Sequence, residues 1–388
     1  MRKRQYDEDD VRVRPGKGSR PRTRIRPAHE QAVEGFVVAV DRGRYTCLVG
    51  DGIPQPRDHG TGDHGTGDHE AGRSGPGERV IDGQVIGEHG SHDGAAAGGR
   101  RARGGRRGKK GKPTLVVAMK ARELGRKGIV VGDRVALVGD VTGQPDTLAR
   151  IVRVEERSSM LRRSADDIDD IERPIVANAD QLVIVTALAD PPPRPRMIDR
   201  MLVAAFDADI DPLLCLTKAD LAPAGDLVAL YEPLGVPYLV VQKGGSLDEL
   251  RERLTDRMSV LVGHSGVGKS TLVNALVPHA DRAVSHVNAV TGRGRHTSTS
   301  AVALELPEGG WIIDTPGVRS FGLAHVSVET VLAAFPDLNE ATVDCPKGCT
   351  HLGEECALNR FVAEGHAEPA RLESLRRLLA SREGSDDD

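Results

Sequence analysis

The chain has 388 residues, with 53 lysines and arginines against 57 aspartates and glutamates, so its formal net charge is −4. This length allows two or three domains and a sizeable core. No apolar run approaches the roughly 20 residues that a membrane-spanning helix needs. The N-terminal segment MRKRQYDEDD has no apolar stretch behind its charges, which is unlike a signal peptide. We therefore expect a cytoplasmic protein that does not contact membranes.

Charge is distributed unevenly along the chain. The N-terminal third carries dense basic runs, whereas Asp386, Asp387 and Asp388 close an acidic tail. Such asymmetry indicates an anionic partner for the basic part, with an ordinary solvated surface as the alternative. Residues 1–32 are charged and rich in arginine and proline, and they have too little apolar surface to fold alone. We expect them to form a disordered basic tail.

A small β-barrel is predicted over residues 33–160. The run GFVVAVDRGRYTCLVG, which starts at Gly35, has the pattern of two short strands joined by a turn. Three further strand patterns follow later in the chain: TLVVAM (114–119), GDRVALVG (132–139) and LARIVRVEE (148–156). Five such strands fit an OB-type barrel, although an SH3-like barrel would give much the same pattern.

Residues 51–113 interrupt this predicted barrel. They are mostly glycine, aspartate, histidine and arginine, with a DHGTG repeat, so disorder is expected and the histidines favour a solvated tract over a metal site. The basic segment RRARGGRRGKKGK (100–112) is typical of segments that bind RNA phosphates, with a flexible spacer as the alternative. Arg162 and Arg163, just beyond the barrel, are further candidates for RNA contact.

Residues 161–325 alternate between buried-strand patterns and helical patterns. This alternation predicts a parallel sheet covered by helices. A hairpin and a last strand are expected over 303–317, and residues 326–388 are expected to be mostly helical apart from a cysteine cluster. The four strand runs are QLVIVTALA (181–189), PLLCLTKAD (212–220), PYLVVQ (237–242) and MSVLVGHSG (258–266).

The segment GHSGVGKS matches the phosphate-loop pattern G-x-x-x-x-G-K-[ST] between a strand and a helix. Its glycines let backbone N–H groups turn toward phosphate oxygens, and the helix N-terminus adds partial positive charge. Lys269 is expected to reach the β- and γ-phosphates and to assist catalysis, and the Ser270 hydroxyl to bind Mg²⁺. The expected nucleotide-binding residues of this segment are Gly263, His264, Ser265, Gly266, Val267, Gly268, Lys269, Ser270 and Thr271.

Two further motifs follow apolar strand runs at a distance from the phosphate loop. Asp314-Thr315-Pro316-Gly317 ends an apolar strand, where Asp314 can hold the Mg²⁺ shell and the Gly317 N–H can contact the γ-phosphate. Thr217-Lys218-Ala219-Asp220 resembles the N/T-K-x-D guanine motif, in which the aspartate accepts the N1–H and 2-amino donors that adenine lacks and the lysine stem packs on the base. The alternative for Asp220 is a capping role in a strand-to-helix turn.

The base motif precedes the phosphate loop, the reverse of the ordinary GTPase order. With this order, the chain resembles the circularly permuted ribosome small-subunit-dependent GTPases, the RsgA/YjeQ family. The resemblance extends to KARELGRKGIVVGDRVALVGD in the barrel, EERSSMLRR and IVANADQLVIV at the junction, GRGRHTSTS (292–300) and the cysteine cluster. It implies an OB barrel, a permuted GTPase domain and a zinc-binding C-terminal domain. It also implies GTP hydrolysis stimulated by the small ribosomal subunit, whose late maturation the family assists.

The basic, hydroxyl-rich segment GRGRHTSTS is expected to be ordered by γ-phosphate and Mg²⁺. Thr297 is expected to supply the second hydroxyl ligand to Mg²⁺, with Ser298 as the alternative. Val318 stands where many GTPases have a water-orienting glutamine, and a valine cannot orient water. The resemblance implies that His296 positions the attacking water instead, while the alternative is that His296 only contacts ribosomal RNA.

Three cysteines and a histidine crowd into one short segment, Cys345-x₃-Cys349-x-His351-x₄-Cys356. Four such ligands suit a tetrahedral, closed, structural Zn²⁺ site. The x₃ and x₄ gaps are each one residue shorter than in the family. The alternative is that this segment binds no metal. Cys47 and Cys215 lie in strand-like runs and are expected to be ordinary buried residues.

These features predict a monomeric enzyme that uses GTP, Mg²⁺ and one structural Zn²⁺, and that binds the small ribosomal subunit and its rRNA. One alternative is a ribosome-binding chaperone with a purely structural nucleotide. Another is an ATPase, against which Asp220 argues.

Overall fold

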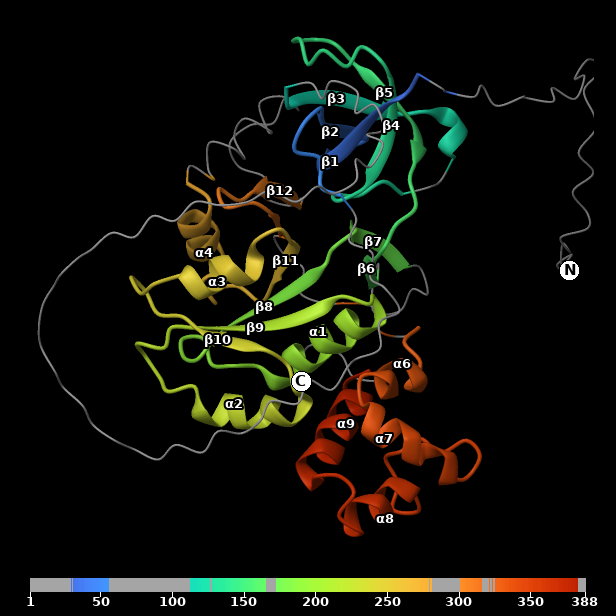
Figure 1. Ribbon diagram of the computed structural model, residues 1–388, viewed down its shortest axis with the longest axis vertical. Coiled ribbons are helices and arrows are strands. Elements are labelled where there is room, and N and C mark those ends of the chain that lie inside the picture. The colour runs from blue at the N-terminus through green and yellow to red at the C-terminus, as the bar shows by residue number, and fades with distance from the viewer. Residues whose placement is uncertain are drawn as a thin grey trace, which may run out of the picture.

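The computed structural model describes residues 29, 31–55, 112–125, 128–164, 172–278, 280, 301–315, 321, 323 and 325–382. A barrel lies at one end of the molecule, a sheet with helices occupies the middle, and a group of helices from the C-terminal part lies at the other end (Figure 1). The predictions for the basic tail, most of the 51–113 insertion and the acidic tail fall outside the described residues.

The N-terminal strands close into a five-stranded barrel, as the sequence predicted. β1 pairs with both β2 and β4, β2 pairs with β3, β3 pairs in parallel with β5, and β5 returns to β4. Val37, Cys47 and Ile151 are fully buried inside it. The elements are β1 (Val33–Asp41), β2 (Arg44–Val49), β3 (Thr114–Lys120), η2 (Arg122–Leu124), β4 (Arg134–Gly139) and β5 (Ala149–Val154).

A hairpin that the sequence pattern did not predict connects the barrel to the central sheet. It consists of β6 (Met160–Ser164) and the antiparallel β7 (Glu172–Ala177). Asp133 of the barrel is completely buried, and its carboxylate accepts a hydrogen bond from Nε of Arg157 at 2.7 Å. The same guanidinium donates to the carbonyl oxygen of Gly128 at 2.7 Å and to Sδ of Met160, the first residue of β6, at 3.0 Å, so one arginine ties the start of the hairpin to the barrel.

The central sheet has the strand order β10-β9-β8-β11-β13-β12. The first five strands are parallel and β12 is antiparallel to β13, which confirms the predicted α/β architecture. β12 also meets β1 of the barrel at Ala39 and Val302. The strands are β8 (Gln181–Ala187), β9 (Asp211–Thr217), β10 (Tyr238–Val240), β11 (Met258–Val262), β12 (Val302–Glu305) and β13 (Trp311–Asp314).

Side-chain alternation along the strands determines which helices cover each face of the sheet. On β8, Leu182 and Ile184 pack with helices α1 and α2, whereas Val183 and Val185 pack with α3 and α4. Both faces are therefore buried, which explains the nearly continuous apolar runs. The helices are α1 (Pro195–Asp207), α2 (Gly225–Tyr231), α3 (Asp248–Leu254) and α4 (Lys269–Leu276), with η3 (Glu232–Leu234) after α2.

The C-terminal part is helical and shares its core with the central sheet. Leu375, Leu378 and Leu379 of α9 belong to the same buried cluster as Met201 and Leu202 of α1. Among the described helices, the longest have 13 residues, and none is long and apolar enough to cross a bilayer. The elements are α6 (Val328–Ala333), α7 (Pro336–Ala341), η4 (Thr342–Asp344), α8 (Ala357–Ala363) and α9 (Pro369–Ser381).

Candidate nucleotide site and metal cluster

The predicted phosphate loop connects β11 to α4 at the carboxyl edge of the sheet. Gly263, Gly266 and Gly268 have φ values of 141°, 85° and 101°, a region that other L-residues rarely adopt. A Cβ on Gly263 would lie 2.2 Å from the carbonyl oxygen of Val185. Glycine is therefore required here both by the backbone conformation and by the close approach of β8.

Lys269 opens α4 and folds back over the loop. Its ammonium donates to the carbonyl oxygen of Gly263 and, at 3.0 Å, to that of His264. Burial lowers the pKa of Lys269, while the charge of Asp314 acts in the opposite direction. The lysine is thus a partly desolvated cation held above the loop, and its attraction for an anion is stronger there than in water.

Asp314 lies at the end of β13, beside Leu261 of β11 in the sheet register. Burial raises the pKa of the Asp314 carboxyl, and the nearby Lys269 lowers it. The next residue is fixed as well, because Oγ1 of Thr315 donates to the carbonyl oxygen of Leu261 at 2.9 Å. The sheet therefore brings the predicted carboxylate and the predicted lysine to one place, although they are far apart in the sequence.

The Thr217–Asp220 loop touches the phosphate loop directly. Oγ1 of Thr217 donates to the carbonyl oxygen of Val267 at 2.6 Å, and Thr217 itself is buried. Lys218 has a φ of 59°, and its ammonium bonds to the carbonyl oxygen of Asp190. Asp220 lies exposed on the same loop. The carboxyl ends of parallel strands explain how motifs in permuted order meet at one edge.

The loop after β8 also lines this edge, and the sequence analysis did not assign it to the site. The Cδ atom of Pro191 lies 3.5 Å from where a Cβ of Gly266 would be. Burial lowers the pKa of His264, and the charges of Arg194, Lys269 and Lys218 lower it further. A proline cluster directly after a strand at the carboxyl edge was the available signal.

Some predicted site residues fall outside the described residues. They are Gly317 of the γ-phosphate motif, and His296, Thr297 and Ser298 of the basic segment, together with Val318.

The C-terminal cysteine cluster brings four ligand atoms within 4.8 Å of one another. Nδ1 of His351 lies 3.6 Å from the sulfur atoms of both Cys345 and Cys356, and these sulfurs are 3.7 Å apart. Metal–sulfur bonds of about 2.3 Å in a tetrahedron require ligand atoms about 3.8 Å apart, which matches this spacing. Cys345, Cys349, His351 and Cys356 can therefore hold a metal ion.

The surroundings of the cluster fix the histidine in place. His351 has a φ of 61° and is buried, and its carbonyl oxygen accepts from Nε of Arg376 at 3.1 Å. Burial raises the pKa of the Cys356 thiol to about 11 and lowers the pKa of His351. Metal binding must displace the thiol protons, so occupancy is expected to depend on pH.

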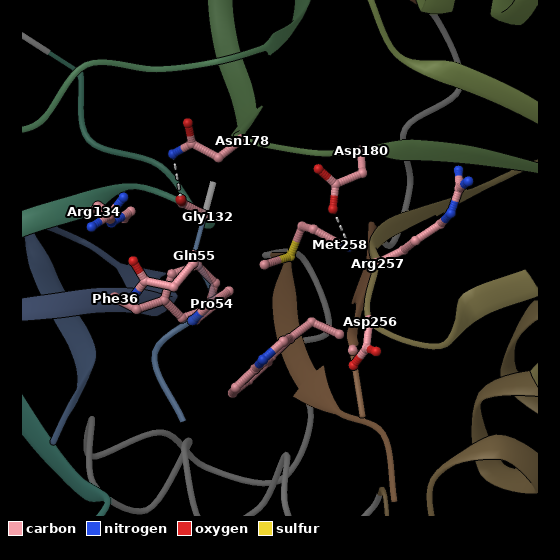
Figure 2. A pocket seen from close by; sticks show the side chains of 12 residues that line it. Phe36, Pro54, Gln55, Gly132, Arg134, Asn178, Asp180, Asp256, Arg257 and Met258 are labelled. Atoms are coloured by element: carbon pink, nitrogen blue, oxygen red, sulfur yellow. Dashed lines mark hydrogen bonds between the residues drawn. The ribbon is translucent and has the colours of Figure 1, made fainter. Parts of the chain in front are cut away.

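A cavity of about 290 Å³ lies at the opposite, amino edge of the sheet, beside the barrel (Figure 2). Phe36 of the barrel and Trp311 of β13 meet there with ring centroids 5.2 Å apart. The carboxylate of Asp180 accepts from the N–H of Met258 at 2.7 Å, and Nδ2 of Asn178 donates to the carbonyl oxygen of Gly132 at 2.8 Å. The protein itself supplies hydrogen-bond partners for these polar groups. We therefore interpret the cavity as a seam, that is, as part of the interface between barrel and sheet.

The phosphate loop follows β11, a central strand of the parallel sheet. The base loop follows β9, which comes earlier in the chain. These two features define the class of protein. The molecule is a P-loop GTPase with a circularly permuted sheet. Comparison with known proteins gives the family: the sequence model described as RsgA GTPase matches residues 154–324. The chain belongs to the RsgA GTPase family and is a GTP-hydrolysing enzyme, as the sequence resemblance predicted.

Individual relatives agree with this assignment. The "Small ribosomal subunit biogenesis GTPase RsgA" of Pseudomonas aeruginosa (strain LESB58) is 40% identical over 268 residues, 66% of this chain and 77% of the relative. The protein of the same name from Pseudomonas fluorescens (strain SBW25) is 41% identical over 263 residues, 65% and 75% of the two chains.

Two solved structures share the fold. YjeQ from Thermotoga maritima has a TM-score of 0.56 at 22% identity and covers 91% of this chain and 99% of its own. YloQ, described as a circularly permuted GTPase, has a TM-score of 0.53 at 20% identity, with 91% and 96% covered.

Proposed function

We propose that the chain acts in the biogenesis of the small ribosomal subunit. It binds the maturing subunit with GTP, hydrolyses GTP to GDP and phosphate under stimulation by the subunit, and then leaves. The names of the relatives support the process. The observation that best supports the nucleotide site is the hydrogen bond between Thr217 and Val267, because it brings the loop that we expect to bind the base into contact with the phosphate loop.

The triphosphate lies on the loop of residues 263–268, with Lys269 on its β- and γ-phosphates. Guanine pairs with the exposed carboxylate of Asp220. Because the Thr217 hydroxyl is already donated to Val267, this threonine positions the base loop and leaves base contact to its neighbours. The stem of Lys218 packs on the base.

Mg²⁺ fits the oxygen donors at this edge, which are the exposed hydroxyl of Ser270 and the carboxylate of Asp314. From the sequence alone we expect Thr297 to supply a further hydroxyl. When bound, the ion neutralises charge on the β- and γ-phosphates. His296 positions the attacking water, and Gly317 donates its N–H to the γ-phosphate. These roles of His296, Thr297 and Gly317 stay predictions from the sequence.

The four-ligand cluster holds a structural Zn²⁺, because all four donors come from the protein and the metal has no open position. In purified protein we expect about one zinc per chain. Cys356→Ala should lose that zinc and destabilise the C-terminal helices. Cys215→Ala removes a buried cysteine of the central sheet and should keep full zinc content in elemental analysis. Equal zinc in both variants would remove the metal assignment.

The remaining predictions concern the wider context. The protein works in the cytoplasm as a monomer and contacts rRNA through its barrel, the 100–112 basic segment, and Arg162 and Arg163. Domain boundaries at 33–160, 161–325 and 326–388 also stay predictions, as does the disordered tail over 1–32.

Single-turnover GTP hydrolysis with and without purified small subunits tests the function. We expect faster hydrolysis with subunits, no competition by ATP, and loss of activity in Lys269→Ala. Hydrolysis that subunits leave unchanged would favour the alternative of a ribosome-binding chaperone with a structural nucleotide.

A further inference from the structure

The loop between β8 and helix α1 packs against both loops of the proposed nucleotide site. The carbonyl oxygen of Asp190 accepts a hydrogen bond from the ammonium of Lys218, which belongs to the loop that follows β9. The next residue, Pro191, faces the phosphate loop, where its Cδ and Cγ atoms lie 3.5 and 4.0 Å from where a Cβ of Gly266 would be. We therefore expect the residues that follow Pro191 to lie close to the proposed phosphate site.

Arg194 ends this loop, and helix α1 fixes its backbone. Its carbonyl oxygen accepts from the N–H of Ile198 at 3.1 Å, within the first turn of the helix. The carbonyl oxygen of Pro195, the first residue of the helix, accepts from the hydroxyl of Tyr231 at 3.0 Å. Prolines at positions 191, 192, 193 and 195 restrict the chain further. The loop thus presents the Arg194 side chain at little additional cost in conformational entropy.

The side chain of Arg194 is exposed, and it does not cap the helix. Within the part of the chain that the structure describes, its guanidinium has no hydrogen bond or salt bridge. An extended chain advances at most about 3.6 Å per residue, so the Cα of Arg194 lies within about 11 Å of that of Pro191. The guanidinium is therefore an available cation close to the phosphate loop.

Electrostatic effects place this guanidinium on the side of the phosphate loop. Burial is the main cause that lowers the pKa of His264, and among the neighbouring charges Arg194 lowers it most, ahead of Lys269 and Lys218. This order is informative because Lys269 belongs to the same loop as His264, whereas Arg194 is exposed and water weakens the effect of its charge. The charge of Arg194 can exceed that of Lys269 in its effect only if it lies near His264.

Three cations thus gather at this edge of the sheet, and two of them are already hydrogen-bonded. The ammonium of Lys269 donates to carbonyl oxygens of the phosphate loop, and that of Lys218 donates to the carbonyl oxygen of Asp190. Like charges that gather at one place repel one another, and an anion bound between them relieves the repulsion. Arg194 keeps its planar fork of N–H donors for such an anion, and this fork matches the oxygen atoms of a phosphate group.

We propose that Arg194 is a further phosphate-binding residue, which reaches the bound guanine nucleotide from the loop after β8 and pairs with its phosphate oxygens. This inference rests on the proposed nucleotide site. Arg194 approaches from the side of His264 and Gly266, whereas Lys269 approaches from the start of α4. The phosphates are therefore held by cations from two separate loops of the sheet.

Binding of a fluorescent, non-hydrolysable GTP analogue tests this role. Arg194→Gln should bind the analogue about tenfold more weakly, and Arg194→Lys, which keeps the charge, should lose no more than about threefold. Added salt should weaken binding less steeply in Arg194→Gln than in the parent chain, because one charge pair has been removed. Arg196→Gln is the matched control: it removes the same charge two residues further along, and its affinity should stay within about twofold.

A second measurement uses the protein without nucleotide. The pKa of His264 can be followed by NMR titration, with His264→Gln to assign the signal. This pKa should rise in Arg194→Gln, because a neighbouring cation is lost, and should stay unchanged in Arg196→Gln. A pKa that does not rise would place the guanidinium away from the phosphate loop and overturn the proposal, and so would unchanged affinity for the analogue.

Lys269→Ala distinguishes the failure of this proposal from the failure of the proposed function. If Lys269→Ala loses affinity for the analogue while Arg194→Gln does not, the nucleotide site stands and Arg194 has no part in it. If neither variant loses affinity, the nucleotide site itself is wrong.

Discussion

The two edges of the central sheet differ in how their polar groups are satisfied. At the carboxyl edge, burial shifts the pKa of Lys269 down and that of Asp314 up, and the glycines of the loop have left-handed φ values. At the amino edge, Asp180 and Asn178 are held by backbone partners around a cavity of about 290 Å³. Perturbed charges and constrained backbone therefore distinguish the carboxyl edge, where we propose that the nucleotide binds, from the amino edge, where the cavity lies.

The largest expected effect lies at the carboxyl edge. Lys269→Ala should weaken GTP binding at least roughly 100-fold, because a desolvated cation makes charge-assisted hydrogen bonds to phosphate oxygens. Titration with a fluorescent GTP analogue measures this. The control is Arg257→Ala at the amino edge, which should bind GTP normally. Comparable losses of GTP affinity in the two variants would contradict the proposal that GTP binds at the carboxyl edge and not at the amino edge.

A pH effect is expected at the helix that supports the sheet. Burial raises the pKa of Asp199 to about 6 even though Arg377 opposes the shift. The folded state therefore holds this proton more tightly than the unfolded state, in which the pKa is near 4. The contribution of Asp199 is most favourable below about pH 4 and is lost as the pH rises through about 6.

Asp199→Asn removes this titration. Urea unfolding at several pH values between 4 and 7 should show a free energy of unfolding that depends on pH less in the variant than in the parent chain. The same pH dependence in both proteins would mean that Asp199 titrates normally, with Arg377 outweighing burial.

The smallest effect is expected at the amino edge. Asn178 donates to the carbonyl oxygen of Gly132 and accepts from the N–H of Ser158 at 2.9 Å, with a φ of 57° that asparagine tolerates well. Asn178→Ala should lower stability by about 1–2 kcal/mol, measured by denaturant unfolding, and leave GTP affinity unchanged. A loss of GTP affinity without a loss of stability would make the seam part of the nucleotide site.

Much of the carboxyl edge could be predicted because each motif directly follows an apolar strand run. Parallel strands all end at the same edge, so Thr217, Lys269 and Asp314 were expected to meet despite their order. The metal cluster was predictable for another reason, since its four ligands lie within one short segment and three thiolates with an imidazole suit tetrahedral coordination.

Contacts between distant segments could not be predicted in this way. The bond from Thr217 to Val267 depends on how closely two strands approach, and the bond from Arg200 of α1 to the carbonyl oxygen of Ser381 depends on how α9 docks. The β6–β7 hairpin was not predicted because its sequence, with Arg162, Arg163 and Pro174, lacks a strong apolar alternation. Tertiary contact, rather than local pattern, determines these features.

The central claim is that the Thr217–Asp220 loop reads guanine beside the phosphate loop, and Asp220→Asn tests it most directly. Guanine donates its N1–H and 2-amino hydrogens to a carboxylate, whereas xanthine has a carbonyl oxygen at position 2 that an asparagine amide can donate to. We predict that this variant binds GTP about 10- to 100-fold more weakly and xanthosine triphosphate more tightly than the parent chain does. Unchanged affinities for both nucleotides would contradict the account.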